Sequence, residues 1–195
     1  MKPVFLSLVG PQAGTTRLYE KLKFAWPATF PDRTCEFLGD PLAEHWEKMK
    51  IGDKRKRDFP PMARLCFRWG FFYAYNERVV GPAFKRGVDV ILVRQFGFDV
   101  YAGAVVHNDC ERSLSLHMAL VPFGVYDLEL CAPLYVFTEE LDDRTRLNHD
   151  RYFAPGNGQR SCRINPALSD NDKVAALTDI ARAELARREE TAVAA

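Results

Sequence analysis

Three short apolar runs divide the chain, and each is typical of a β-strand that is covered on both faces of a sheet. They are the segments 4–9, 88–93 and 134–137. Residues 10–14, which follow the first run, include two glycines and are expected to form a turn. The three runs are therefore expected to be neighbouring strands in the interior of a sheet.

Two stretches early in the chain carry apolar residues at helical spacing. Leu18 and Leu22 predict a helix over 15–24, and a loop rich in Pro and Asp is expected at 27–33. A second helix is expected from Pro41, a position where helices commonly begin. Its single apolar stripe would consist of Leu42, Trp46 and Met49.

Two longer helices are expected later in the chain. Residues 62–84 are apolar on most faces, so they predict a buried helix, ended by Lys85, Arg86 and Gly87. The last predicted helix spans 170–190, begins near Ser169 and is patterned by Val174, Leu177, Ile180 and Leu185. Strands that alternate with helices imply an α/β three-layer sandwich with a central parallel sheet. No repeat or linker divides the chain, so 1–195 is expected to form one domain.

The composition is that of an ordinary globular protein. The 195 residues, 47% of them hydrophobic, suffice for a substantial core. A formal net charge of +1 gives no overall reason to expect nucleic acid or a membrane as partner. Five scattered cysteines and an N-terminal apolar run too short for a membrane span favour an intracellular, reducing compartment, either the cytoplasm or an organelle matrix.

Positive charge is concentrated at residues 54–57, which read Lys-Arg-Lys-Arg. Such a run is usually a solvated loop. Four adjacent basic side chains also create a local field, so this segment is a candidate contact for RNA phosphates or for an acidic protein surface. Its members are Lys54, Arg55, Lys56 and Arg57. The residues after Arg188, which bury little area, are a second candidate contact with other protein subunits.

Several strings in the chain resemble the motifs of one protein family. GPQAGTT at 10–16 has the order of parts of a phosphate-binding loop. EFLGDPLAE at 36–44 resembles the family's EPGGTPLGE, and residues 79–96 resemble its helix end, glycine turn and following strand. Residues 163–185 resemble its closing strand, adenine-side loop and final helix. The chain thus resembles the thymidylate kinases, within the P-loop nucleoside and nucleotide kinase group. The resemblance covers nearly the whole chain and implies a P-loop kinase fold.

The resemblance also implies an altered phosphate site. A Walker A loop, GxxxxGK(S/T), holds phosphates on backbone N–H groups, neutralises charge with its lysine and binds magnesium through its hydroxyl. With Gly14-Thr15-Thr16 placed on Gly-Lys-Thr, Thr15 takes the position of the lysine. ATP would lie on Gly10, Gly14, Thr15 and Thr16, with Mg²⁺ on Thr16. Arg17 is a substitute cation, although its side chain leaves the helix about 100° further round.

Other groups that the family uses are partly present. Arg94 matches the arginine of the family's Asp-Arg-Tyr motif, but Val93 stands at the position of its aspartate. Glu36 matches an acidic residue of the family. The family's Asp-Arg pair, which helps to bind the nucleobase, falls at residues 71–72, and both are Phe here. A lid-like segment at about 142–163 would hold arginines that stabilise the transferring phosphoryl group. They are Arg144, Arg146, Arg151, Arg160 and Arg163.

Each of these matches has a structural alternative. GPQAGTT would then be a turn kept for folding, and Glu36 a surface or helix-capping carboxylate. Arg94 would pair with Glu36 or Asp99, and the lid arginines would form a solvated surface. The histidines, which lack the spacing of metal ligands, are interpreted as structural or surface residues: His107, His117 and His149.

Two functions are compatible with this sequence. The chain lacks the Walker lysine, the aspartate of the Asp-Arg-Tyr motif and the Asp-Arg pair that binds the nucleobase. Their joint loss favours a non-catalytic protein that acts as a structural or binding subunit of a larger assembly. The alternative is a divergent kinase that transfers a phosphoryl group from ATP to dTMP or a related nucleotide. In that case Glu36 and Arg94 would be its catalytic residues, as the resemblance implies.

Overall fold

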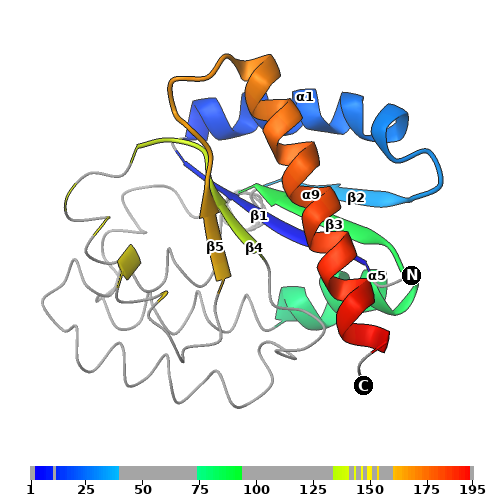
Figure 1. The fold of residues 1–195 in the computed structure, drawn as a ribbon. Helices are drawn as coiled ribbons and strands as arrows, with labels where there is room; N and C mark the ends of the chain where they lie inside the picture. Colours follow the sequence, from blue (N-terminus) through cyan, green and yellow to red (C-terminus); the bar gives the residue numbers. More distant parts are fainter. Residues whose placement is uncertain are drawn as a thin grey trace, which may run out of the picture.

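The fold is built on a parallel sheet of five strands (Figure 1). The computed structural model describes residues 3–10, 12–39, 74–93, 134–140 and 160–193, together with Asp143, Arg146, His149, Asp150 and Phe153. The strands stand in the order β2, β3, β1, β4 and β5, and every neighbouring pair is parallel. Their bounds are Cys35–Leu38 (β2), Asp89–Val93 (β3), Phe5–Val9 (β1), Leu134–Phe137 (β4) and Arg160–Arg163 (β5).

The three apolar runs of the sequence form the three inner strands, which confirms the prediction. β1 occupies the middle, with β3 on one side and β4 on the other. The apolar pattern did not predict β2 or β5, and only the family resemblance indicated a closing strand near residue 163. These strands read CEFL and RSCR and lie at the two ends of the described sheet. Four residues of mixed polarity give no recognisable alternation.

Helices cover both faces of the sheet, which confirms the three-layer architecture (Figure 1). α1 (Gln12–Thr29) and α9 (Asp170–Val193) pack against each other on one face. The fully buried core beneath them includes Leu6, Leu8, Leu22, Trp26 and Leu177. On the other face, Phe84 packs edge-on against Phe5 of β1, with ring centroids 5.6 Å apart.

The helix that carries Phe84 has a wide turn before its last segment. A π-helical turn, η1 (Asn76–Val80), leads directly into α5 (Gly81–Lys85). Pro82 has no N–H, and its ring crowds the carbonyl four residues earlier, which accounts for the wide turn there. Gly87 follows with φ of 74°, a conformation that favours glycine, and ends the helix as predicted. Residues 62–73 of the predicted long helix lie outside the described residues.

α1 is longer at both ends than the sequence pattern indicated. It spans Gln12–Thr29, so the expected turn at 10–14 is wrong from residue 12, and the expected loop at 27–33 is wrong for its first three residues. Pro27 lies in the last turn, where its missing N–H removes one helical hydrogen bond. Trp26, which is 1% exposed, packs into the core, and this burial outweighs the lost bond.

α9 begins where the sequence predicted and continues further. Ser169 Oγ accepts a hydrogen bond from the backbone N–H of Asp172 at 3.3 Å and so caps the helix. The helix ends at Val193 rather than at residue 190, so the segment after Arg188 is helical up to that point. In the parts of the chain that the structure describes, no helix is long and apolar enough to cross a membrane.

A buried carboxylate at the amino edge of the sheet was not predicted. Asp89 is the first residue of β3 and is 0% exposed. Arg33 Nη2 donates to its Oδ1 at 2.6 Å, and the backbone N–H of Val4 donates to the same atom at 2.7 Å. Asp89 therefore joins the start of β3 to the chain segments that enter β1 and β2.

Candidate functional site

The expected phosphate loop lies at the carboxyl edge of the sheet, where parallel α/β folds bind ligands. β1 ends at Val9 and α1 begins at Gln12, so two residues connect them. Gly10 is closely surrounded, because a Cβ atom there would lie 2.6 Å from Thr138 Oγ1 and 2.9 Å from Thr15 Oγ1. A side chain at position 10 would therefore require both threonine hydroxyls to move.

The two threonines that follow have different surroundings. Thr15, at the position of the Walker lysine in the resemblance, is 0% exposed, and its hydroxyl lies close to Gly10. Thr16, the candidate magnesium ligand, is exposed. Thr138, just after β4, donates its hydroxyl to the carbonyl of Val9 at 3.2 Å. The start of α1 is thus packed against the ends of β1 and β4.

A carboxylate lies against the first turn of α1. Glu139 Oε1 is 3.0 Å from the position that a Cβ atom would take at Gly14, and its Cγ is 3.3 Å from the corresponding position at Gly10. Lys173 of α9 places Nζ 3.5 Å from the same Oε1, and its side chain is 7% exposed. Sequence reasoning missed both residues. The available indication was a pair of acidic residues, Glu139 and Glu140, directly after a buried strand.

The substitute cation Arg17 is engaged in an ion pair with α9. Its Nε and Nη2 donate to the carboxylate of Asp170, the first residue of that helix. Hydrogen bonding from Arg17 lowers the pKa of Asp170 from its ordinary value. Lys21, one turn further along α1, lies 3.5 Å from the same carboxylate. Arg17 thus links α1 to α9.

Glu36, the acidic residue implied by the resemblance, is paired across the sheet edge. Its Oε1 accepts a hydrogen bond from Arg86 Nη2 at 2.6 Å, and both side chains are partly exposed. This contact joins β2 to the turn that follows α5. Arg94, the other candidate catalytic residue, lies outside the described residues, as do residues 71–72 and the basic segment 54–57. Their predicted roles stay predictions.

Two of the arginines that the resemblance assigned to a lid belong to the sheet. Arg160 and Arg163 are the first and last residues of β5. Arg160 Nη2 lies 2.7 Å from Oε2 of Glu184 on α9. Arg146 Nη1 lies 3.9 Å from Asp143 Oδ1. The remaining members of the series lie outside the described residues: Arg144 and Arg151.

His149 has the packed surroundings of a structural histidine. It is 8% exposed, and its ring contacts those of Phe137 and Phe153, with centroids 4.8 and 4.7 Å away. Its Nε2 lies 3.1 Å from Ser161 Oγ, and its Nδ1 lies 2.9 Å from Asp150 Oδ1. His149 therefore contacts both β4 and β5.

Comparison with known proteins gives a clear result for the fold. No family model and no curated protein sequence matches the chain. Among solved structures, the chain is similar to thymidylate kinase from Ehrlichia chaffeensis, with a TM-score of 0.63 and 15% sequence identity. The match covers 91% of this chain and 99% of the other. The protein thus has an α/β fold similar to that of thymidylate kinase.

Proposed function

We propose that this protein is a non-catalytic, thymidylate kinase-like protein that acts as a structural or binding subunit of a larger assembly. The observation that carries the proposal is the two-residue connection between β1 and α1. A Walker A loop places four residues between its glycines and surrounds phosphate with their backbone N–H groups. Here α1 begins at Gln12, before Gly14, so helix occupies most of the stretch in which a Walker A loop would surround phosphate. ATP and Mg²⁺ therefore fit this turn poorly.

The charges beside the turn support the same proposal. Glu139 holds a carboxylate oxygen 3.0 Å from the Cβ position at Gly14, where it repels an incoming phosphate. Lys173 is paired with Glu139, and Arg17 is paired with Asp170. Each of these cations would have to leave an existing ion pair before it could neutralise a nucleotide.

The proposed contact surfaces are the basic segment 54–57 and the segment after Arg188, with protein subunits or RNA as partners. Replacing the four basic residues by Glu should weaken co-purification of the partner, more strongly at low salt, while the melting temperature stays nearly unchanged. The substitutions are Lys54→Glu, Arg55→Glu, Lys56→Glu and Arg57→Glu. A protein that captures no partner from a cell extract, and that is unaffected by the change, would contradict the assembly role.

A divergent kinase is the second candidate, and the position of Lys173 favours it. This lysine lies 3.5 Å from a carboxylate that adjoins the turn. Rotation of Glu139 would therefore leave an unpaired cation close to Gly14 at the start of α1. ATP would then lie on the turn with Mg²⁺ on Thr16, and Glu36 and Arg94 would serve dTMP or a related acceptor.

Phosphoryl transfer from ATP to each nucleoside monophosphate separates the two candidates. Kinases turn over at about 1–100 per second, whereas we expect this chain to give no turnover above the rate without protein. The comparison needs two lysine variants, Lys173→Met and the matched control Lys21→Met, which changes an exposed lysine on α1. Turnover that Lys173→Met abolishes and Lys21→Met retains would reject the non-catalytic role and identify Lys173 as the replacement cation.

A further inference from the structure

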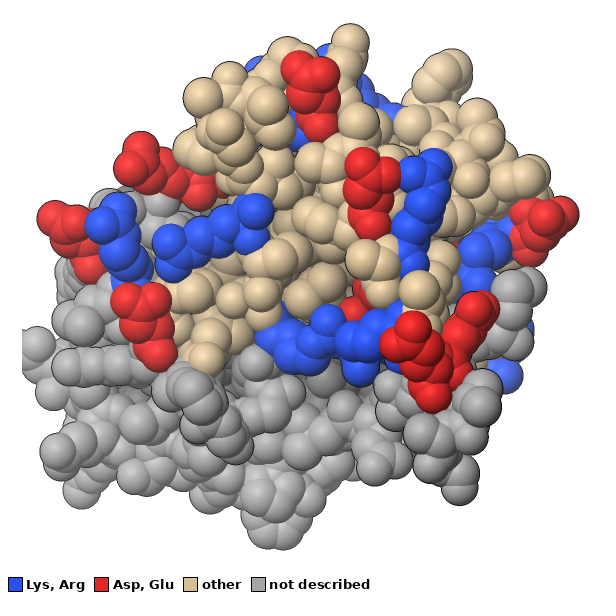
Figure 2. All heavy atoms as spheres, viewed as in Figure 1, with Lys and Arg blue, Asp and Glu red and all other residues tan. Residues whose placement is uncertain are grey.

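An open pocket lies at the amino end of β4 and β5, at the opposite edge of the sheet from the turn after β1. Its volume is about 570 Å³, which is within the range of small-molecule sites. In Figure 2 the surface is hollowed at its centre, beside basic side chains. Residues of both strands, of α9 and Phe153 line it: Leu134, Phe153, Arg160, Ser161, Cys162, Ile180, Ala183, Glu184 and Arg187.

One buried carboxylate organises three arginines at this pocket. Glu184, whose side chain is 1% exposed, accepts hydrogen bonds from Arg160, Arg187 and Arg188 at 2.7 to 3.1 Å. Burial opposes ionisation of Glu184, but hydrogen bonds from Arg187, Arg160 and Arg188 outweigh it and lower its pKa to about 2. One negative charge therefore faces three positive charges, so these four groups carry a net positive charge.

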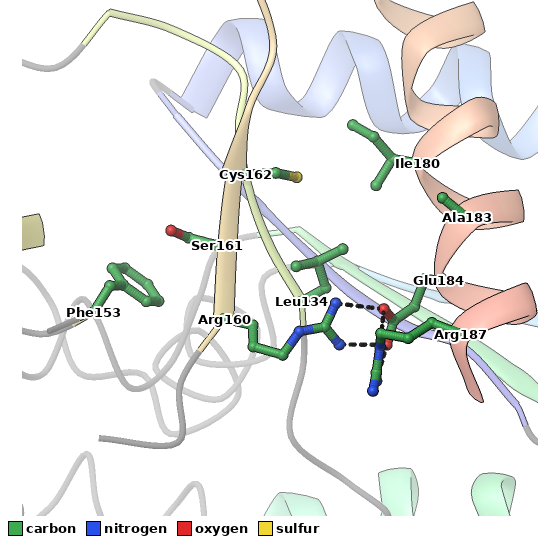
Figure 3. A pocket seen from close by; sticks show the side chains of 9 residues that line it. All are labelled: Leu134, Phe153, Arg160, Ser161, Cys162, Ile180, Ala183, Glu184 and Arg187. Carbon is green, nitrogen blue, oxygen red and sulfur yellow. Dashed lines mark hydrogen bonds and ion pairs between the residues drawn. The ribbon is translucent and has the colours of Figure 1, made fainter. Parts of the chain in front are cut away.

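The two outer arginines both point toward Glu184 (Figure 3), and their side chains remain partly exposed. Arg160 comes from β5 and Arg187 from α9, and their side chains are 43% and 44% exposed. Each donates two hydrogen bonds to Glu184, so both guanidinium groups are ordered before a ligand arrives. Within the described residues, Arg160 uses two of its five N–H groups in these bonds, which leaves the others for an anion.

The remaining walls of the pocket are largely apolar. Leu134 begins β4, and Ile180 and Ala183 face the pocket from α9 in Figure 3. Phe153 adds an aromatic ring. Cys162 contributes a neutral thiol, because burial raises its pKa to about 11. A ligand that fits would therefore combine an apolar body with an acidic group.

We propose that this pocket binds a small organic anion, whose acidic group lies against Arg160 and Arg187 and whose apolar body packs on Leu134, Ile180 and Phe153. A carboxylate and a phosphate monoester share this chemistry. The inference is independent of the proposed function, because the pocket and the turn after β1 lie at opposite edges of the sheet.

Three probes of similar size test the proposal by isothermal titration calorimetry at low salt. They are phenylbutyrate, phenyl phosphate and the neutral phenylbutanol. Hydrogen bonds to charged groups are worth enough that at least one anion should bind about tenfold or more tightly than the alcohol. The anion that binds more tightly identifies the acid class. Equal binding of all three probes, or binding of none, overturns the proposal.

Two variants show whether the anion occupies this pocket. Arg160→Gln removes a guanidinium, and Ala183→Glu adds a negative charge to the wall without removing a polar contact. Each should weaken anion binding about tenfold or more, whereas Ala175→Glu, at an exposed position of the same helix, should change it by less than about twofold. Circular dichroism melting verifies folding. If Arg160→Gln fails to fold, Ala183→Glu still decides the question.

Unchanged affinity in Ala183→Glu would overturn the proposal. So would binding of a glutamate-rich peptide in the absence of binding by either small anion, since the arginines would then serve a protein partner.

Discussion

The two edges of the sheet hold their charges in different ways. At the amino edge, the carboxylates of Asp89 and Glu184 are 0% and 1% exposed, and each accepts several hydrogen bonds. At the carboxyl edge, Glu139 is 31% exposed and lies 3.5 Å from Lys173, its one cationic partner among the described residues. Asp170, at the start of α9, is 23% exposed. The carboxylates of Asp89 and Glu184 are therefore buried and multiply bonded, whereas those of Glu139 and Asp170 are partly solvated.

This contrast is the reverse of what an α/β enzyme leads one to expect. Such folds bind and transform ligands at the carboxyl edge of the sheet. A buried charge is tolerated only when it is paired, and loss of one partner is costly. The amino edge of this protein should therefore govern its stability, while changes at the carboxyl edge should leave the fold nearly unaffected.

The largest expected effect comes from Asp89→Ala. The substitution leaves the Arg33 guanidinium, which is 10% exposed, and the N–H of Val4 without their buried acceptor. Breaking a buried pair in this way costs about 3–5 kcal/mol, measured as the free energy of unfolding in urea. Asp32→Ala, at an exposed position before β2, is the matched control and should have little effect. A loss below about 1 kcal/mol for Asp89→Ala would contradict the assignment of stability to the amino edge.

Acid pH tests the second buried carboxylate. The pKa of Glu184 is lowered from 4.5 to about 2 in the folded protein, so its contribution is complete above pH 4.5 and is lost as the pH falls toward 2. That contribution is about 3 kcal/mol. Glu184→Gln should flatten the dependence of the unfolding free energy on pH in this window. An equally steep dependence in the variant would show that other carboxylates cause the acid sensitivity.

The smallest expected effect is that of Arg17→Gln. Arg17 is 62% exposed, and its partner Asp170 is solvated, so water screens the ion pair. We expect the melting temperature to change by less than about 2 °C. A much larger decrease would place structural importance at the carboxyl edge and weaken the contrast between the two edges.

The sequence predicted the interior of the fold better than its edges. Runs such as 134–137 are apolar throughout, and an interior strand of a sheet buries such a run on both faces. The start of α1 could not be located in the same way, because a Gly-containing segment is compatible with either a loop or a helix. The role of Asp89 could not be predicted, because it lies within an apolar run and its partner Arg33 is 56 residues away in the sequence.

The candidate site was predictable only in part, for the same reason. Resemblance identified Thr15 and Thr16 as positions of interest, and the structure places both at the start of α1. Glu139 and Lys173 approach this turn from β4 and α9, at sequence distances that no local pattern spans. The resemblance assigned Arg160 to a lid-like segment; in the structure it is the first residue of β5 and is paired with Glu184 of α9, a contact that no local pattern indicated.

The central claim is that the turn after β1 does not hold a nucleotide, and thermal unfolding with millimolar ATP and Mg²⁺ tests it most directly. A ligand present at a hundred times its Kd stabilises a fold by about 2.7 kcal/mol, which for a chain of this size raises the melting temperature by several degrees. We predict no measurable shift for the natural sequence. A gain in the double variant Thr15→Lys with Glu139→Gln would indicate that a lost lysine and an added carboxylate together disabled the turn. A shift of several degrees in the natural sequence, abolished by Lys173→Met but kept in Lys21→Met, would contradict the claim.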